Sequence, residues 1–313
     1  MAVAGLLSAL RCAGVRPADA RLLFHGAGEA GTGIGALWAL YLQRRHAVPE
    51  AEARGRCLFL DSKGLLCASR ADARAGRLPA HKRPFAHDVP FHADLLAAVR
   101  ALRPTALVGV SAQAGAFTTD VLAAMADASP RPIIFALSNP TSLAECTAAQ
   151  AVAAAPGRVL FASGSPFDDV PGGAPGGKAT LRPSQANNAY IFPALGFGAA
   201  LSHASSLPDE TFILAAEVRP SRARFPQPHR PNPRTPAQIL ASMVSSRALA
   251  LGQLFPPVER MRDVAARLAA AVAAQAVADG RGVAPPGVAM AGGWEPYVRK
   301  QMWSPPPVLE SRL

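Results

Sequence analysis

The amino-acid sequence predicts an α/β fold, in which a doubly wound parallel sheet is followed by a helical C-terminal region. Short apolar runs begin at residues 22, 56, 106, 133 and 159, at the spacing of βα units. The last three runs lack alternation, as strands covered by helices on both faces should. The first run enters a glycine-rich turn that leads into a helix-forming stretch, and from residue 208 the pattern becomes helical. Together these features predict a Rossmann-like sheet.

Three glycines in the turn after the first run, Gly26, Gly28 and Gly31, have the G-x-G-x-x-G spacing. In a dinucleotide-binding unit the first makes the turn, the second lets a pyrophosphate approach the backbone, and the third lets helix and strand pack closely. The pyrophosphate then lies on free N–H groups at the helix N-terminus. Because this spacing alone is weak evidence, a simple glycine-rich turn is the alternative.

The second run ends in a carboxylate, Asp61, which suits an acid that hydrogen-bonds the ribose hydroxyls of a dinucleotide. Its separation from the glycine turn exceeds the usual ~20 residues. The connection must therefore contain additional structure, which we expect at residues 48–55.

The last three runs are each followed by small polar residues, among them Ser111, Ser138, Asn139 and Ser163. Ligands of open α/β sheets bind at the carboxyl ends of the strands. We therefore expect the binding site at these loops.

Two amides, Asn187 and Asn188, precede an apolar stretch that extends to residue 201. Such a pair can cap a helix, or it can hydrogen-bond a carboxylate or carboxamide of a ligand. The residues alone leave both interpretations open.

Helical spacing of apolar residues predicts helices over 91–102 and 258–278. Residues 1–16 are apolar with two arginines and no acid, which is typical either of a targeting peptide or of an amphipathic helix.

We expect an NAD(P)-binding domain over residues 1–204 and a C-terminal helical region over residues 205–282. Residues 218–236 hold five arginines, six prolines and no acid, which predicts a loop or a disordered insert within that region. The Pro and Gly content of residues 283–313 predicts a poorly ordered tail.

The composition favours a soluble intracellular protein. The formal net charge is +11, but lysine occurs only at Lys63, Lys82, Lys178 and Lys300, and no nucleic-acid-binding motif accompanies the arginines. No apolar run approaches the length of a membrane span. The four cysteines show no metal-ligand spacing and are expected to be reduced. We therefore expect neither nucleic acid nor a membrane as a partner.

Several longer stretches, in the family's order, resemble the C-terminal NAD(P)-binding half of malic enzymes, which oxidise and decarboxylate malate. The resemblance extends from residue 1 to about residue 280, and it makes residues 1–10 similar to an interior helix. The matching stretches are GAGEA (26–30), DSKGL (61–65), FAH (85–87), PIIFALSNPTS (132–142), FASGSPFD (161–168) and QANNAYIFP (185–193), with weaker matches at LFPP (254–257) and RDV (262–264).

The resemblance implies which residues bind the cofactor and the substrate malate or its product pyruvate. Asn139 and Asn188 match asparagines that contact malate and the nicotinamide ribose. The residues implied to bind the cofactor are Gly26, Gly28, Glu29, Ala30, Gly31, Asp61, Ser62, Lys63, Lys82, Arg83, Ser111 and Asn139.

Cofactor choice depends on a cation beside the 2′-phosphate, because a charge-assisted hydrogen bond contributes about 1.5 to 3 kcal/mol, or tenfold or more in affinity. Lys82-Arg83-Pro84 resembles the Lys-Lys-Pro of plant-like NADP enzymes, although it lies slightly farther from Asp61. We expect NADP, with NAD as the alternative.

The reaction also needs a base, an acid and a divalent metal. In malic enzymes a lysine, a tyrosine and three carboxylates that precede the matched region serve these roles. We therefore assign no catalytic residue and no metal ligand to this chain, and expect Mg²⁺ or Mn²⁺ only in a complete enzyme.

Three interpretations follow: part of a malic enzyme whose N-terminal half is absent, a non-catalytic dinucleotide-binding module or regulatory subunit, or a different NAD(P) oxidoreductase. A complete enzyme is expected to be a homo-oligomer. The sequence does not distinguish cytosol, mitochondrion and plastid.

Overall fold

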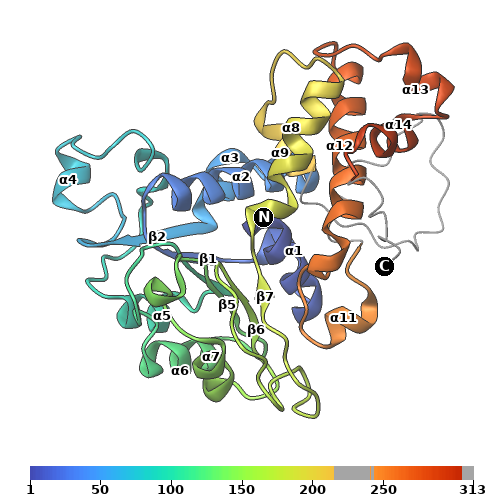
Figure 1. Ribbon diagram of the computed structural model, residues 1–313. Helices are drawn as coiled ribbons and strands as arrows, with labels where there is room; N and C mark the ends of the chain where they lie inside the picture. The colour runs from blue at the N-terminus through green and yellow to red at the C-terminus, as the bar shows by residue number, and fades with distance from the viewer. Residues whose placement is uncertain (215–239, 241–242, 305–313) are drawn as a thin grey trace.

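The computed structural model describes residues 1–214, 240 and 243–304 (Figure 1). At its centre lies a seven-stranded sheet with the strand order β3-β2-β1-β4-β5-β6-β7. Neighbouring strands are parallel, except that β2 and β3 are antiparallel. The predicted doubly wound parallel sheet is thus confirmed, and its order reverses between β1 and β4. The strands are β1 (Leu22–His25), β2 (Cys57–Asp61), β3 (Gly64–Leu65), β4 (Ala106–Gly109), β5 (Ile133–Ala136), β6 (Leu160–Ser163) and β7 (Ser184–Gln185).

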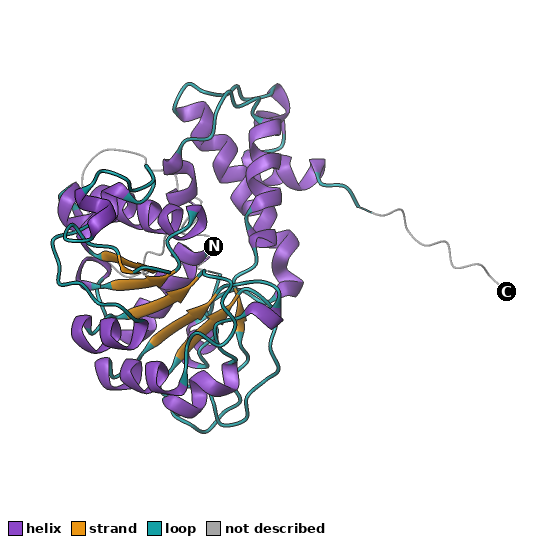
Figure 2. Cartoon of the chain, turned by 90° about the vertical axis from the view of Figure 1, so that its left-hand side faces the viewer, coloured by secondary structure: helices purple, strands orange, loops and turns teal. Residues whose placement is uncertain are grey.

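Helices cover both faces of the sheet, as Figure 2 shows. Within β1, Leu22 and Phe24 pack with the helices of one face, whereas Leu23 packs with those of the other. Both sets are buried, which explains why the runs do not alternate. On the first face lie α1 (Ala2–Ala13), α2 (Glu29–His46) and α3 (Glu50–Gly55), and on the second α5 (Leu95–Leu102), α6 (Thr119–Ala128) and α7 (Ala148–Ala154).

The additional structure expected at residues 48–55 is the helix α3. The helix expected from residue 91 begins later, because Asp94 is its N-cap and accepts a hydrogen bond from the backbone N–H of Ala97 at 2.8 Å. Residues 2–13 form the helix α1, but residues 2–10 are all buried, so it is an interior helix and the expectation of an amphipathic one is wrong. Smaller elements are α4 (Ala71–Arg74) and the 3-10 turns η1 (Pro17–Asp19), η2 (Arg83–Phe85), η3 (Thr141–Leu143), η4 (Asn188–Tyr190) and η5 (Val258–Arg260).

The helical region after the sheet is built on the packing of α8 against α12, side by side in Figure 1. Gly198 permits this contact, because a Cβ atom there would lie 2.6 Å from the carbonyl oxygen of Ala269. The helices that the described residues of this region form are α8 (Phe192–Leu201), α9 (Asp209–Leu214), α11 (Ser246–Ala250), α12 (Met261–Ala278), α13 (Pro286–Met290) and α14 (Trp294–Gln301).

The expectation of a poorly ordered tail is wrong for residues 286–301. They form α13 and α14, and Val298 is fully buried against the core. Arg299 pairs with Asp263 of α12 and with Glu295, which ties α14 to α12. The proposed insert at residues 218–236 lies outside the described residues, and the boundary at residue 204 stays a prediction. Within residues 1–214 and 243–304, no helix is both long and apolar enough to cross a membrane.

Candidate functional site

The glycine turn joins β1 to α2 in a conformation that only small residues permit. Gly26 has φ +115°, and a Cβ atom there would lie 2.6 Å from the carbonyl oxygen of Val110. A Cβ atom at Gly31 would lie 2.5 Å from the carbonyl oxygen of Gly26. A Cβ atom at Gly28, in contrast, would meet nothing within 4 Å. The turn is therefore tight at both ends and open at Gly28.

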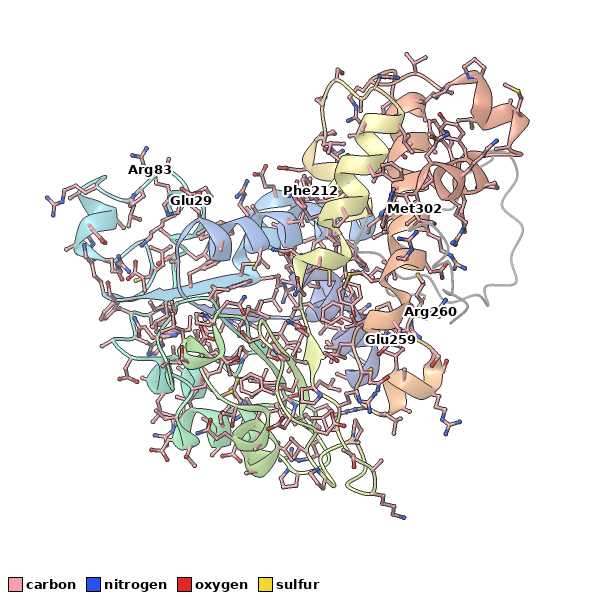
Figure 3. The ribbon with its side chains drawn as sticks, viewed as in Figure 1. Glu29, Arg83, Phe212, Glu259, Arg260 and Met302 are labelled. Carbon is pink, nitrogen blue, oxygen red and sulfur yellow. The ribbon has the colours of Figure 1, made fainter. Side chains whose placement is uncertain are left out.

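The N-terminus of α2 has the properties of an anion site. Gly28 is its N-cap and supplies no side-chain hydrogen bond, so the first N–H groups of the helix have no side-chain cap. Gly28, Glu29 and Ala30 are all exposed. Glu29 contacts His81, with its Oε1 atom 3.2 Å from Nδ1. Figure 3 shows Glu29 and Arg83 on the same side of the molecule.

Asp61, at the carboxyl end of β2, is at the centre of a cluster of charges. Its Oδ1 atom accepts hydrogen bonds from the backbone N–H of Lys63 at 2.9 Å and from Arg70 at 2.8 Å. Its Oδ2 atom accepts one from Lys82 at 2.7 Å. Burial alone would raise the pKa of Asp61, but the hydrogen bonds from Arg70 and Lys82 outweigh it and lower the pKa. Asp61 is therefore a carboxylate.

Arg70 connects Asp61 to a second carboxylate, Asp72. Its side chain is 6% exposed and donates two hydrogen bonds to Asp72, at 2.7 and 2.9 Å. Lys63 also pairs with Asp72, at 3.4 Å. Arg70 is not among the residues that the sequence pattern predicted. It lies five residues beyond the matched stretch 61–65, and no motif in the sequence marks it.

The loops after β4 and β5 lie at the same edge of the sheet. The Ser111 hydroxyl lies 3.0 Å from Nδ1 of His25, the last residue of β1. Asn139 is exposed, and its Oδ1 atom accepts a hydrogen bond from Ser165, after β6, at 2.6 Å. The predicted residues Ser111 and Asn139 are therefore held by contacts between neighbouring strands.

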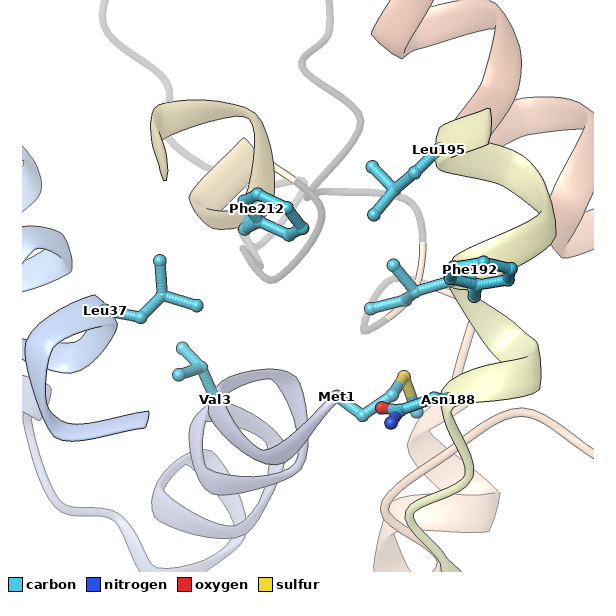
Figure 4. Close-up of a pocket in the computed structure, with 8 residues that line it drawn as sticks. Met1, Val3, Leu37, Asn188, Phe192, Leu195 and Phe212 are labelled. Atoms are coloured by element: carbon cyan, nitrogen blue, oxygen red, sulfur yellow. The ribbon is translucent and has the colours of Figure 1, made fainter. Parts of the chain in front are cut away.

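Of the two amides, Asn187 caps a helical turn and Asn188 lies where it could contact a ligand. Asn187 is a cap, because its Oδ1 atom accepts a hydrogen bond from the backbone N–H of Ala189 at 2.9 Å. Asn188 instead lines a cavity of about 260 Å³ between α1, α2, α8 and α9 (Figure 4). The rest of the lining shown there is mostly apolar and includes Met1, Phe192 and Phe212.

The predicted site residues thus form three groups at the end of the sheet and beyond it. The glycine turn and the Asp61 cluster follow β1 and β2, Ser111 and Asn139 follow β4 and β5, and Asn188 lies in η4, which leads into α8. Among the described residues, no hydrogen bond or ion pair joins Asn188 to the first group.

Within the described residues, no group of three or more His, Cys, Asp or Glu side chains has the geometry to hold a metal ion. Asp169 pairs with Arg182 at 3.5 Å and is exposed. The four cysteines are free, and burial raises the pKa of Cys146 to about 12.

A doubly wound sheet with an open glycine turn at an uncapped helix N-terminus, and an acid at the end of the second strand, defines a dinucleotide-binding protein. Residues 1–229 match the family model described as "Malic enzyme, NAD binding domain". The chain therefore belongs to the malic enzyme family.

Plant relatives agree with this assignment. The chain is 43% identical to NADP-dependent malic enzyme of Vitis vinifera over 274 residues, which are 88% of this chain and 42% of that protein. It is 41% identical to NADP-dependent malic enzyme 2 of Arabidopsis thaliana over 87% of this chain and 42% of that protein. It therefore spans about two fifths of the length of these curated relatives.

Two solved structures have a similar fold. The malic enzyme of Entamoeba histolytica superposes with a TM-score of 0.68 at 20% identity, over 96% of this chain and 50% of that one. The malic enzyme of Pyrococcus horikoshii superposes with a TM-score of 0.66 at 19% identity, over 96% and 56%.

Proposed function

We propose that this chain binds NADP as the cofactor-binding part of a malic enzyme. The oxidative decarboxylation of malate to pyruvate then belongs to a complete enzyme, in which other residues supply the base, the acid and the ligands of Mg²⁺ or Mn²⁺. This assignment of catalysis to residues outside the chain is supported by the length of the plant relatives, since the chain spans 42% of the Vitis vinifera enzyme.

The observation that carries NADP over NAD is the balance of charge around Asp61. An unpaired acid at the end of the second strand would repel a 2′-phosphate. Here Asp61 and Asp72 contribute two negative charges, and Lys63, Arg70 and Lys82 contribute three positive charges. The cluster therefore has one excess positive charge at the position where the adenosine ribose binds in this fold.

The residues at this edge of the sheet have distinct roles in the proposal. The open backbone at Gly28 and the N–H groups that begin α2 receive the pyrophosphate. Lys82, Arg83, Ser62 and Lys63 are the groups available to the 2′-phosphate. NADP, when bound, supplies the hydride acceptor.

On the other side of the strand-order reversal, the loops that carry Ser111 and Asn139 receive the nicotinamide half. We propose that Asn139 and Asn188 contact malate through their amides, Asn188 from the cavity that it lines.

Titration of the purified chain with NADPH and with NADH, followed by nucleotide fluorescence, tests the proposal. We expect NADPH to bind at least tenfold more tightly. Equal dissociation constants would contradict the role given to the cations around Asp61, and no binding of either nucleotide would contradict the proposed function altogether.

A dinucleotide-binding module or regulatory subunit without catalysis is the second candidate, because the chain spans so small a share of its relatives. Malate-dependent reduction of NADP in the presence of Mn²⁺ separates the possibilities. We expect no turnover by this chain alone. Turnover by the isolated chain would show that it contains a complete set of catalytic groups.

A further inference from the structure

A fully buried carboxylate, Glu145, lies beneath the loops that follow β4 and β5. Its Oε1 atom accepts hydrogen bonds from the backbone N–H of Ser111 at 3.1 Å and from the Ser138 hydroxyl at 2.5 Å. Its Oε2 atom accepts one from the backbone N–H of Ser138 at 3.4 Å. One side chain thus joins two loops that come from different strands.

Further contacts extend this network in both directions. The Ser138 hydroxyl accepts a hydrogen bond from the backbone N–H of Ala112 at 2.9 Å, so its own proton is directed to Glu145. The Ser111 hydroxyl lies 3.5 Å from Oε1 of Glu145 and 3.0 Å from His25. The network therefore spans the ends of β1, β4 and β5.

The backbone provides space for this carboxylate. Gly109, the last residue of β4, lies directly against it, and a Cβ atom at Gly109 would overlap the Cδ and Oε2 atoms of Glu145. The segment from Gly109 to Ser111 is thus shaped around the Glu145 side chain.

We propose that Glu145 is a positioning residue that holds the loops after β4 and β5 in the arrangement that receives the nicotinamide half of the dinucleotide. The inference rests on the proposed dinucleotide binding. Glu145 is buried and does not itself reach the ligand. It acts through Ser111 and through Asn139, which follows Ser138 directly in the chain.

The network requires a carboxylate. Each of its two oxygens faces a backbone N–H group that cannot rotate away, from Ser111 on one side and from Ser138 on the other. A glutamine of the same size has one oxygen and one NH₂ group. In either orientation its NH₂ group would oppose one of these N–H groups, so the substitution would separate the two loops without creating a cavity.

The test compares Glu145→Gln with the wild-type chain, using NADPH and 2′,5′-ADP as probes in isothermal titration. The second probe contains only the adenosine half, which the Asp61 cluster is proposed to bind. We expect NADPH to bind about tenfold more weakly to the variant, as for one disrupted hydrogen bond to a buried charge. Binding of 2′,5′-ADP should stay within about twofold of the wild type.

Two further variants make the comparison decisive. Glu259→Gln makes the same chemical change at an exposed residue far along the chain and should alter neither affinity. Ser138→Ala removes only the hydroxyl and should weaken NADPH binding about threefold, so it tests the network even if Glu145→Gln does not fold.

Loss of affinity for both probes by the same factor would overturn the inference, because it would show general destabilisation. Unchanged NADPH affinity in Glu145→Gln and Ser138→Ala would also overturn it. If the wild-type chain bound neither probe, the proposed function itself would fail, and the inference with it.

Discussion

Replacement of Lys82 by methionine isolates the electrostatic contribution to cofactor choice. The Lys82 ammonium lies 2.7 Å from Asp61 Oδ2, and its side chain is 19% exposed. Methionine keeps most of the apolar stem and removes the charge. The cluster of three cations and two carboxylates then has no excess positive charge.

The expected magnitude follows from the contact that is lost. A hydrogen bond between charged groups contributes about 1.5 to 3 kcal/mol, which is roughly 10-fold to 150-fold in a dissociation constant. Because Lys82 shares its charge with Asp61, we expect the lower end, about tenfold weaker NADPH binding. NADH lacks the 2′-phosphate and should lose less than about twofold. Asp61 keeps Arg70 as a partner, so the fold should persist.

Fluorescence titration with both nucleotides measures this difference, and Lys300→Met, at an exposed lysine of α14 outside the Asp61 cluster, is the matched control. Lys300 has no role in the proposed cofactor site, so this variant should bind both nucleotides as the wild type does. If Lys82→Met weakened NADPH and NADH by the same factor, the assignment of Lys82 to the 2′-phosphate would be refuted.

Three other predictions concern the turn and the Asp61 cluster. Gly26→Ala should lower the free energy of unfolding in urea by at least about 2 kcal/mol, because φ is +115° and the added Cβ meets Val110. Gly28→Ala should leave stability unchanged and weaken nucleotide binding. Equal losses of stability in the two variants would contradict this reasoning. Arg70→Met should lower the free energy of unfolding in urea by about 3 kcal/mol, because it breaks the buried ion pairs with Asp61 and Asp72. A decrease of less than about 1 kcal/mol would show that Lys82 alone compensates the charge of Asp61. Because the pKa of Asp61 is lowered in the folded state, its carboxylate contributes fully to the free energy of unfolding above the usual pKa of 3.8, and this contribution is lost as the pH falls below that value. In urea unfolding between pH 6 and pH 3, the free energy of unfolding should therefore decrease less for Asp61→Asn than for the wild type. Parallel decreases would contradict the lowered pKa.

The sheet could be predicted from the sequence because each strand is buried on both faces. Leu22, Leu23 and Phe24 must all be apolar when helices cover both sides, so the run is visible without any alignment. The short strands β3 and β7 have two residues each and carry no such pattern. They form only because a longer strand lies beside them.

The pairings among the charged residues of the site could not be predicted, because they depend on contacts between distant segments. Lys82 reaches Asp61 across 21 residues, and Glu145 reaches Ser111 across 34. A glutamate between alanine and cysteine, such as Glu145, indicates a buried carboxylate that accepts hydrogen bonds, but only the fold shows which N–H groups donate them. The helix α14 was not predicted, because prolines surround it in the sequence. It is stabilised by burial of Val298 against the core, a contact that depends on the fold.

A crystal structure of the chain with bound NADP would test the account most directly. We expect the pyrophosphate at the N-terminus of α2 beside Gly28, the 2′-phosphate within hydrogen-bond distance of Lys82 or Arg83, and the nicotinamide at the loops that Glu145 joins. A dinucleotide bound in the opposite direction, or with its 2′-phosphate away from these cations, would contradict the central claim.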